Sequence, residues 1–131
     1  MIGVVLWERQ LPRNTGFVFD LNDRPLSGVQ VKLFIDGQLA ATVSTDVAGH
    51  YDLQSSYDPG ADVTALLWFV APDRSLMPKE LVLRESKGSR ENALISPCVP
   101  RADFLPGKQF RVYLFDLPSR NKELAELNCL P

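Results

Sequence analysis

Residues 29–43 read VQVKLFIDGQLAATV, and this stretch decides the fold. Its first half alternates apolar and polar side chains with a period of two, the pattern of a strand that buries one face. Asp36-Gly37 then supplies two residues that tolerate positive φ, which is typical of a tight hairpin turn. The alternation predicts two antiparallel strands whose buried side chains are Val29, Val31, Leu33, Ile35, Leu39, Ala41 and Val43.

Further short apolar segments, separated by turn residues, follow along the chain. Their patterns predict strands at 15–20, 50–54, 62–71, 81–83, 93–95 and 110–115, with a hairpin tip at 84–92. In the second of these, Tyr51 and Leu53 are expected to be buried. Ser119, after Pro118, is predicted to cap a short C-terminal helix that presents Leu124 and Leu127 on one face.

Together these elements predict an all-β fold, an antiparallel Greek-key β-sandwich of about seven or eight strands with a short C-terminal helix. A length of 131 residues predicts a single domain spanning 1–131. Residues 1–14 form an N-terminal extension in this scheme, and residues 118–131 form a tail or short helix.

The charge balance, the length of the apolar runs and the residue types argue against several classes of partner and cofactor. The chain has 14 Lys+Arg against 16 Asp+Glu, a net charge of −2 and one histidine. Because no basic excess exists to neutralise phosphates, nucleic acid is not expected as a partner. The longest apolar run, residues 65–71, is far shorter than the roughly 20 residues that cross a bilayer, so no membrane insertion is expected. A signal peptide, a cofactor and a metal site with histidine or cysteine ligands are not expected either.

The two cysteines, Cys98 and Cys129, leave two interpretations open. No Cys-x-x-Cys spacing exists, so zinc-finger and redox motifs are excluded. The pair is either two independent thiols in a reducing compartment or a disulfide that holds the tail to the body of the domain.

Three motifs in order resemble the carboxypeptidase regulatory-like domain, one of the transthyretin-like or prealbumin-like sandwiches. They are Gly16-Phe17-Val18-Phe19-Asp20, then Arg24-Pro25-Leu26-Ser27-Gly28-Val29-Gln30-Val31, then Thr45-Asp46-Val47-Ala48-Gly49-His50-Tyr51. They match the family's patterns G-x-V-x-D, P-L-x-G-x-x-V and T-D-x-x-G-x-Y and cover roughly a third of the chain. Asp46 and Gly49 suit a turn that needs carboxylate acceptors and a positive φ, and Tyr51 is expected in the core.

The resemblance implies a non-catalytic binding or spacer module of a secreted, cell-surface or appendage protein, with a protein or carbohydrate partner. Its location would be extracytoplasmic or at the cell surface. An assembly subunit that uses an apolar sheet face as its interface is an alternative, and a small hydrolase of the same fold is another. The oligomeric state is left open.

The catalytic relatives of this fold do not match residue by residue. The 5-hydroxyisourate hydrolases use more than one histidine and a C-terminal Tyr-Arg-Gly-Ser, whereas this chain has only His50 and ends Asn-Cys-Leu-Pro. The intradiol dioxygenases hold iron with two histidines and two tyrosines, which one histidine cannot supply. The Lys–Asn crosslink of some related surface domains has no matching residues in the first and last predicted strands.

Two polar groups are candidate sites. His50 flanks a turn opposite Tyr51 and is expected to be a solvent-facing residue rather than a general base. Asp20, Asn22 and Asp23 offer oxygen ligands for calcium, but they lack the Asp-x-Asp-x-Asp-Gly pattern, which favours a solvated turn.

Four aromatic residues break the polar faces of their strands: Phe34, Trp68, Tyr113 and Phe115. If they are neighbours, they form an apolar binding face. The alternative is that an end of the chain covers them, because Ile2, Val4, Leu6, Trp7, Leu124, Leu127 and Leu130 also present apolar side chains. Burying one leucine or valine is worth roughly 1.5–3 kcal/mol, so one or both ends are expected to fold over the Trp68 and Phe115 side.

Overall fold

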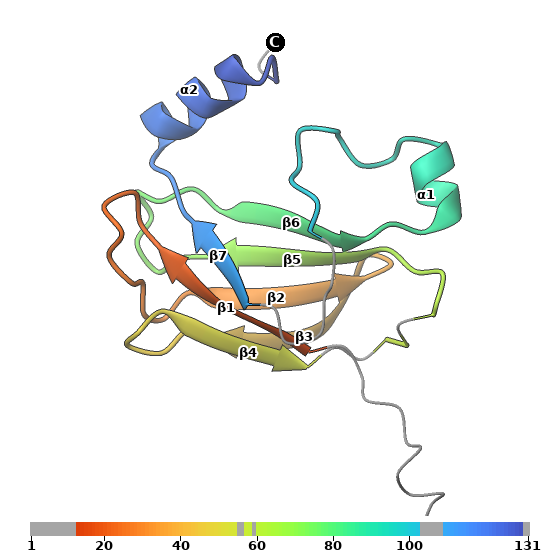
Figure 1. Ribbon diagram of the computed structural model, residues 1–131, viewed down its shortest axis with the longest axis horizontal. Coiled ribbons are helices and arrows are strands. Elements are labelled where there is room, and N and C mark those ends of the chain that lie inside the picture. Colours follow the sequence, from red (N-terminus) through yellow and green to blue (C-terminus); the bar gives the residue numbers. More distant parts are fainter. Residues whose placement is uncertain (1–12, 55–56, 59, 103–108, 130–131) are drawn as a thin grey trace, which may run out of the picture.

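The computed structural model describes residues 13–54, 57–58, 60–102 and 109–129, and they form a β-sandwich (Figure 1). The elements in chain order are β1 (Arg13–Phe19), β2 (Gln30–Ile35), β3 (Gln38–Ser44), β4 (His50–Gln54), β5 (Ala65–Val70), β6 (Lys79–Arg84), α1 (Lys87–Glu91), β7 (Gln109–Tyr113) and α2 (Leu117–Glu126). One sheet has three strands in the order β4-β1-β7, and the other has four in the order β3-β2-β5-β6. The predicted fold class, a β-sandwich of seven or eight strands with a short C-terminal helix, is therefore confirmed, with seven strands among the described residues.

The strand pairs are antiparallel except for one. β1 pairs with β7 in parallel, so that Phe17 lies opposite Arg111 and Phe19 opposite Tyr113. On its other side β1 pairs with β4 antiparallel, with Phe17 opposite His50. The three strands thus bring the beginning, the middle and the end of the chain together in one sheet. Within the described residues, no helix is long and apolar enough to cross a bilayer.

The hairpin predicted at residues 29–43 is present, with Asp36 and Gly37 at φ 49° and 83° between β2 and β3. Val29, Val31, Leu33, Tyr51 and Leu53 are buried as predicted, and Ile35, Ala41 and Val43 are half-buried against the same core. Leu39 is the exception, with 56% of its surface exposed. The register shifts so that Leu33 pairs with Ala41 but Phe34 with Leu39, and this bulge turns Leu39 to the outer face.

The crossing from β3 to β4 is held by the residues of the third motif. The Thr45 hydroxyl donates to the Leu26 carbonyl at 2.6 Å and accepts from the Val29 N–H at 2.9 Å. Asp46 Oδ1 accepts from the N–H groups of Ala48 and His50, both at 2.9 Å. These contacts satisfy the backbone groups at the point where the chain leaves one sheet and enters the other.

Gly16 and Tyr51 form a close contact inside the sandwich. A Cβ added at Gly16 would lie 2.5 Å from the Phe110 carbonyl oxygen and 2.8 Å from the Tyr51 hydroxyl. The tyrosine ring therefore passes over a position where only glycine fits, and it packs edge-on against Phe69 at 5.5 Å between ring centroids.

The segment between β6 and β7 differs from the prediction. Residues 84–92 contain α1 rather than a hairpin tip, because Ser86 caps the helix by accepting from the Ser89 N–H. Residues 93–95 form no strand. Instead Val82 donates to Pro100 and accepts from Ala102, both at 2.8 Å, so residues 100–102 cover the edge of β6.

The C-terminal helix begins earlier than predicted. Asp116, not Ser119, is the N-cap residue, and its carboxylate accepts from the Ser119 N–H at 3.1 Å. Hydrogen bonds from the Ser119 side chain and from its N–H lower the pKa of the Asp116 carboxyl. No residue of α2 is buried.

We predict that Gly16→Ala lowers the free energy of unfolding by about 1–3 kcal/mol, because the new methyl group overlaps backbone and a packed ring. Urea denaturation followed by circular dichroism measures the change. Gly88→Ala is the matched control, since an added Cβ there would meet nothing within 4 Å outside its own helix backbone and chain neighbours. Equal midpoints for the two variants would contradict the close packing of Tyr51 on β1.

Candidate functional site: the outer face of the three-stranded sheet

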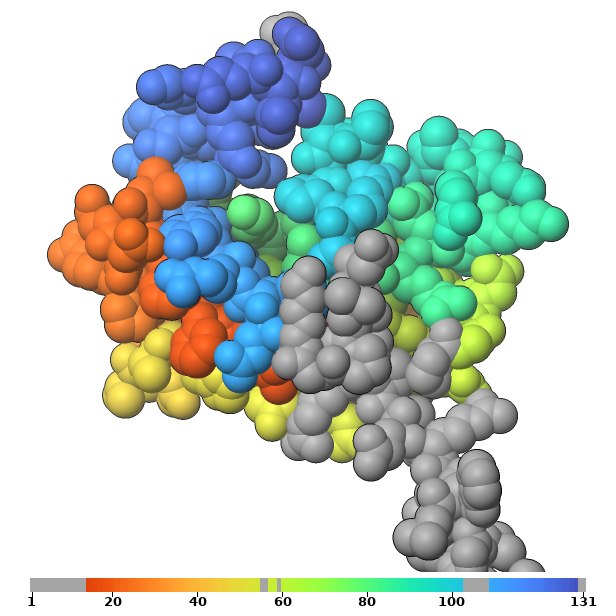
Figure 2. Space-filling model, viewed as in Figure 1, coloured from red at the N-terminus to blue at the C-terminus, as the bar shows by residue number. Residues whose placement is uncertain are grey.

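The outer face of the β4-β1-β7 sheet carries a group of aromatic side chains. Val18 of β1 points into the core with no exposed surface, so its neighbours Phe17 and Phe19 point outward. The strand register places His50 and Arg111 on either side of Phe17, and Tyr113 beside Phe19. Figure 2 shows β1 (red), β7 (blue) and β4 (yellow) side by side on the face turned to the viewer. We call His50, Phe17, Phe19, Arg111 and Tyr113 the aromatic platform.

The rings of the aromatic platform contact one another in a row. Ring centroids are 5.0 Å apart for His50 and Phe17, 6.3 Å for Phe17 and Phe19, and 5.7 Å for Phe19 and Tyr113. These separations are within the range of favourable aromatic pairs. The rings are half-buried, so they contact each other and also keep surface open to solvent.

Arg111 is held in place on this row. Its guanidinium carbon lies 4.7 Å from the centroid of Phe19, a cation–π distance, and its Nη2 donates to the Tyr113 hydroxyl at 3.3 Å. Among the described residues, no carboxylate forms an ion pair with Arg111. A positioned guanidinium with unused donors can bind a carboxylate or another planar anion.

The same face becomes polar toward the start of β1. There Thr15 lies between Asp52 of β4 and Gln109 of β7. The face thus offers aromatic rings at one end and polar side chains at the other.

The four aromatic residues singled out from the sequence do not form one patch. Tyr113 belongs to the aromatic platform, whereas Phe34 and Trp68 lie on the outer face of the other sheet, with ring centroids 5.3 Å apart. Phe115 lies on neither face. Its ring is 5.2 Å from the Lys79 Nζ, at the edge where β6 and β7 approach each other.

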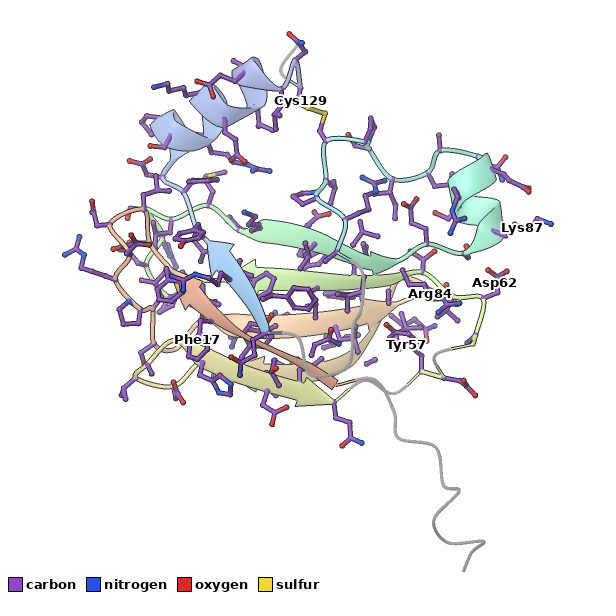
Figure 3. All side chains as sticks on the ribbon, viewed as in Figure 1. Phe17, Tyr57, Asp62, Arg84, Lys87 and Cys129 are labelled. Atoms are coloured by element: carbon purple, nitrogen blue, oxygen red, sulfur yellow. A yellow bond between two sulfur atoms is a disulfide. The ribbon has the colours of Figure 1, made fainter. Side chains whose placement is uncertain are left out.

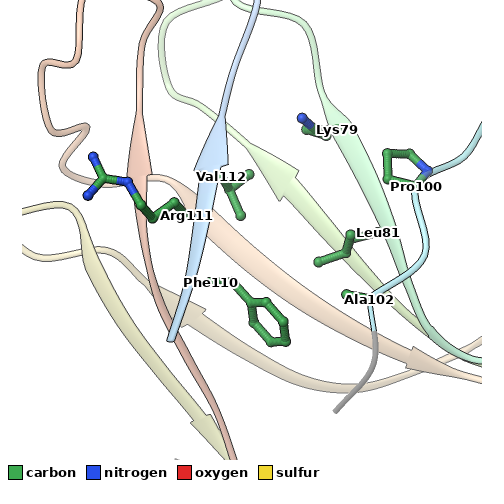
Figure 4. A pocket seen from close by; sticks show the side chains of 7 residues that line it. All are labelled: Lys79, Leu81, Pro100, Ala102, Phe110, Arg111 and Val112. Atoms are coloured by element: carbon green, nitrogen blue, oxygen red, sulfur yellow. The ribbon is translucent and has the colours of Figure 1, made fainter. Parts of the chain in front are cut away.

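A cavity of about 170 Å³ lies at this same edge, between β7 and residues 79–81 and 100–102 (Figure 4). It is lined mainly by apolar side chains and by Lys79, which donates to the Tyr113 carbonyl at 3.3 Å. Burial lowers the pKa of the Lys79 amine. Figure 4 shows the end of the Arg111 side chain directed away from this cavity, toward β1.

Of the two chain ends expected to cover the Trp68 and Phe115 side, only the C-terminal helix lies among the described residues. Ile2, Val4, Leu6, Trp7 and Leu130 lie outside the described residues. Leu124 is half-buried and Leu127 is 58% exposed, so α2 does not cover Trp68 with an apolar face. Instead α2 lies near Lys79. Burial has the largest effect on the pKa of the Lys79 amine and lowers it, while Glu123 of α2 raises this pKa and Arg120 lowers it.

A disulfide joins Cys98 to Cys129, with the two Cα atoms 5.9 Å apart. Figure 3 shows it linking the end of α2 to the loop before β7. The Cys129 N–H also donates to the Leu124 carbonyl at 2.7 Å, which closes the helix end beside the bond. Of the two interpretations left open by the sequence, the structure therefore contains the disulfide.

In the candidate calcium loop, the Asp20 carboxylate accepts hydrogen bonds from residues of the same loop. Asp20 Oδ1 accepts from the N–H groups of Asn22 and Arg24 at 2.8 and 3.0 Å, and Oδ2 accepts from the Arg24 side chain at 3.1 Å. The Arg24 N–H is the main reason that the pKa of Asp20 is lowered. Within the described residues, no group of three or more His, Cys, Asp or Glu side chains is placed to hold a metal ion.

Two buried polar side chains have no hydrogen-bond partner in the part of the chain that the structure describes. They are the Asn14 amide on β1 and the Tyr51 hydroxyl above Gly16. Burial raises the pKa of Tyr51. Unpaired buried groups of this kind cost free energy and are often satisfied by internal water.

Comparison with known proteins finds similarity at the level of structure. No family model and no curated protein matches the chain. The structure is similar to the dioxygenase domain of a dioxygenase–carbohydrate-binding protein fusion from the cellulolytic bacterium Streptomyces sp. SirexAA-E. The TM-score is 0.50 and the identity 17%, over 83% of this chain and 81% of that one. At this identity the likeness concerns the fold alone.

Three residues of the aromatic platform are not predicted from the sequence: Phe17, Phe19 and Arg111. The alternation of β1 around Val18 indicates that both phenylalanines share the outer face, so this signal is present in the sequence. Arg111 gives no such signal, because its contact with Phe19 depends on the parallel pairing of two strands far apart in the sequence.

We predict that replacing both cysteines by serine lowers the free energy of unfolding by about 3–4 kcal/mol, the chain-entropy value for a loop of this length. Thermal and urea unfolding of the oxidised protein and the double variant measure the difference. Addition of a reductant to the wild-type protein should reproduce the loss, and it should leave the variant unchanged. Stability that is independent of reductant would contradict a role for the Cys98–Cys129 bond.

Proposed function

We propose that this protein is a non-catalytic binding module of the carboxypeptidase regulatory-like, transthyretin-like type, and that it binds its ligand on the aromatic platform. The observation that carries the proposal is the solvent-facing row of rings with Arg111 fixed on it, 4.7 Å from the Phe19 ring. A secreted, cell-surface or appendage setting agrees with the Cys98–Cys129 disulfide, because such bonds persist in oxidising compartments.

Support for the family assignment comes from what the motif residues do in the fold. Thr45 and Asp46 satisfy backbone groups at the crossing between the sheets. Gly49 has φ 76°, and a Cβ there would lie 2.6 Å from the Val18 carbonyl. Each of these three motif residues thus has a structural role in the turn between the sheets.

The chemistry of the platform favours a carbohydrate with carboxylate groups as the ligand. The C–H faces of a sugar ring are apolar and pack on aromatic rings, while its hydroxyls need the polar side chains that follow along the sheet. Arg111 adds a positioned cation whose remaining N–H groups have no partner among the described residues, and a uronic acid carboxylate can accept hydrogen bonds from them. A protein ligand is the alternative partner class.

Support for a non-catalytic role comes from the groups that acid–base chemistry would need. The single histidine, His50, packs its ring on Phe17 at 5.0 Å. The Tyr51 hydroxyl is buried beneath the sheet, and burial raises its pKa, which leaves it protonated and out of reach of a ligand.

The test is calorimetric titration with an oligogalacturonate and with its methyl ester, which keeps the sugar rings but removes the charge. We predict that the acid form binds more tightly than the ester. Arg111→Gln should weaken binding of the acid form by at least about tenfold, the value of one charge-assisted hydrogen bond, and leave the ester unaffected. Phe17→Ala should weaken both.

Arg74→Gln and Leu94→Ala are the matched controls, since both residues are exposed and belong to none of the strands β1, β4 and β7. Each should bind as the wild-type protein does. Platform variants that bind both sugars normally, or a wild-type protein that binds neither at millimolar concentration, would overturn the proposed site.

A further inference from the structure

The outer face of the four-stranded sheet carries a second exposed apolar group, remote from the aromatic platform. Trp68 is 36% exposed and Leu39 is 56% exposed. Phe34 lies between them, 5.3 Å from Trp68 between ring centroids and opposite Leu39 in the strand register. Neighbouring exposed apolar side chains such as these are a candidate interaction surface.

The charges beside Trp68 have a defined arrangement. Lys32 of β2 lies directly opposite Trp68 on one side, and Glu80 of β6 lies directly opposite it on the other. Neighbouring strands are about 4.8 Å apart, so the strand positions of a basic and an acidic residue lie at equal distances on either side of Trp68. Among the described residues, neither Lys32 nor Glu80 forms an ion pair within the chain. We call Lys32, Phe34, Leu39, Trp68 and Glu80 the Trp68 face.

This arrangement is self-complementary. If two copies pack face to face around a twofold axis that runs along β5, the axis exchanges the positions of β2 and β6. Lys32 of each copy then lies opposite Glu80 of the other, with the two Trp68 side chains at the axis. A twofold interface requires such a match of one surface with itself.

We propose that the Trp68 face binds a second copy of this chain, so that the protein forms a twofold dimer through the β3-β2-β5-β6 sheet. A bulge places Leu39 beside Phe34 on the same face, where a regular strand would place alanine. An unrelated acidic or basic partner fits less well, since it would oppose one of the two charges. The dimer does not depend on the proposed ligand site, which lies on the other sheet.

Charge reversal tests the dimer directly. Sedimentation equilibrium of the wild-type protein over a concentration series should show a monomer–dimer equilibrium. Lys32→Glu should place two acids opposite each other on both sides of the axis, and Glu80→Lys should do the same with two bases. Each single variant should weaken dimerisation by at least tenfold. Lys87→Glu, a charge reversal at an exposed position in α1, is the control and should dimerise normally.

The decisive measurement mixes the two single variants in equal amounts. In a mixed dimer, the acid introduced at position 32 of one copy meets the base introduced at position 80 of the other, and the remaining pair is the native one. The mixture should therefore dimerise like the wild-type protein although neither variant does so alone. Circular dichroism checks that each variant is folded. A wild-type protein that stays monomeric at millimolar concentration, or a mixture no better associated than its components, would overturn the proposal.

Discussion

The Thr45 hydroxyl is the contact on which the arrangement of the two sheets depends. It donates to Leu26 and accepts from Val29, while the Thr45 backbone accepts from Gly28 at 3.0 Å and donates to Val29 at 2.9 Å. The end of β3 is thereby fixed to the entry of β2, and the next residue, Asp46, turns the chain into β4. Because β4 pairs with β1, this buried group of hydrogen bonds also fixes where β1 and its phenylalanines lie.

The sequence is most informative where local pattern and turn chemistry agree. Alternation with Asp36-Gly37 predicts the β2–β3 hairpin, and the motif residues Thr45, Asp46 and Gly49 indicate a turn, which in the structure is the crossing between the sheets. The prediction for Leu39 is wrong because period two assumes a regular ladder, and a bulge shifts the alternation by one residue. Residues 87–91 form a helix because Ser86 caps them, a local signal that the polar composition of the segment obscures.

The candidate site is less predictable, because a sheet face is assembled from distant segments. Alternation shows that Phe34, Trp68 and Tyr113 point away from their strand's buried side, but it does not show which sheet each strand joins. The parallel pairing of β1 with β7 brings Arg111 and Tyr113 to Phe19 across more than 90 residues of sequence. The result is two separate aromatic surfaces on opposite sides of the sandwich. A dimer through the Trp68 face would leave both aromatic platforms exposed, which favours a ligand with repeated binding groups.

The central claim is that the outer face of β4-β1-β7 is the ligand-binding surface. The most direct test is a ¹⁵N–¹H NMR titration of the labelled protein with oligogalacturonate. The predicted result is a set of chemical-shift changes concentrated on His50, Phe17, Phe19, Arg111 and Tyr113, with little change on β2 and β5. Changes centred on Phe34 and Trp68 or on the cavity beside Lys79, or no change at millimolar sugar, would contradict the claim.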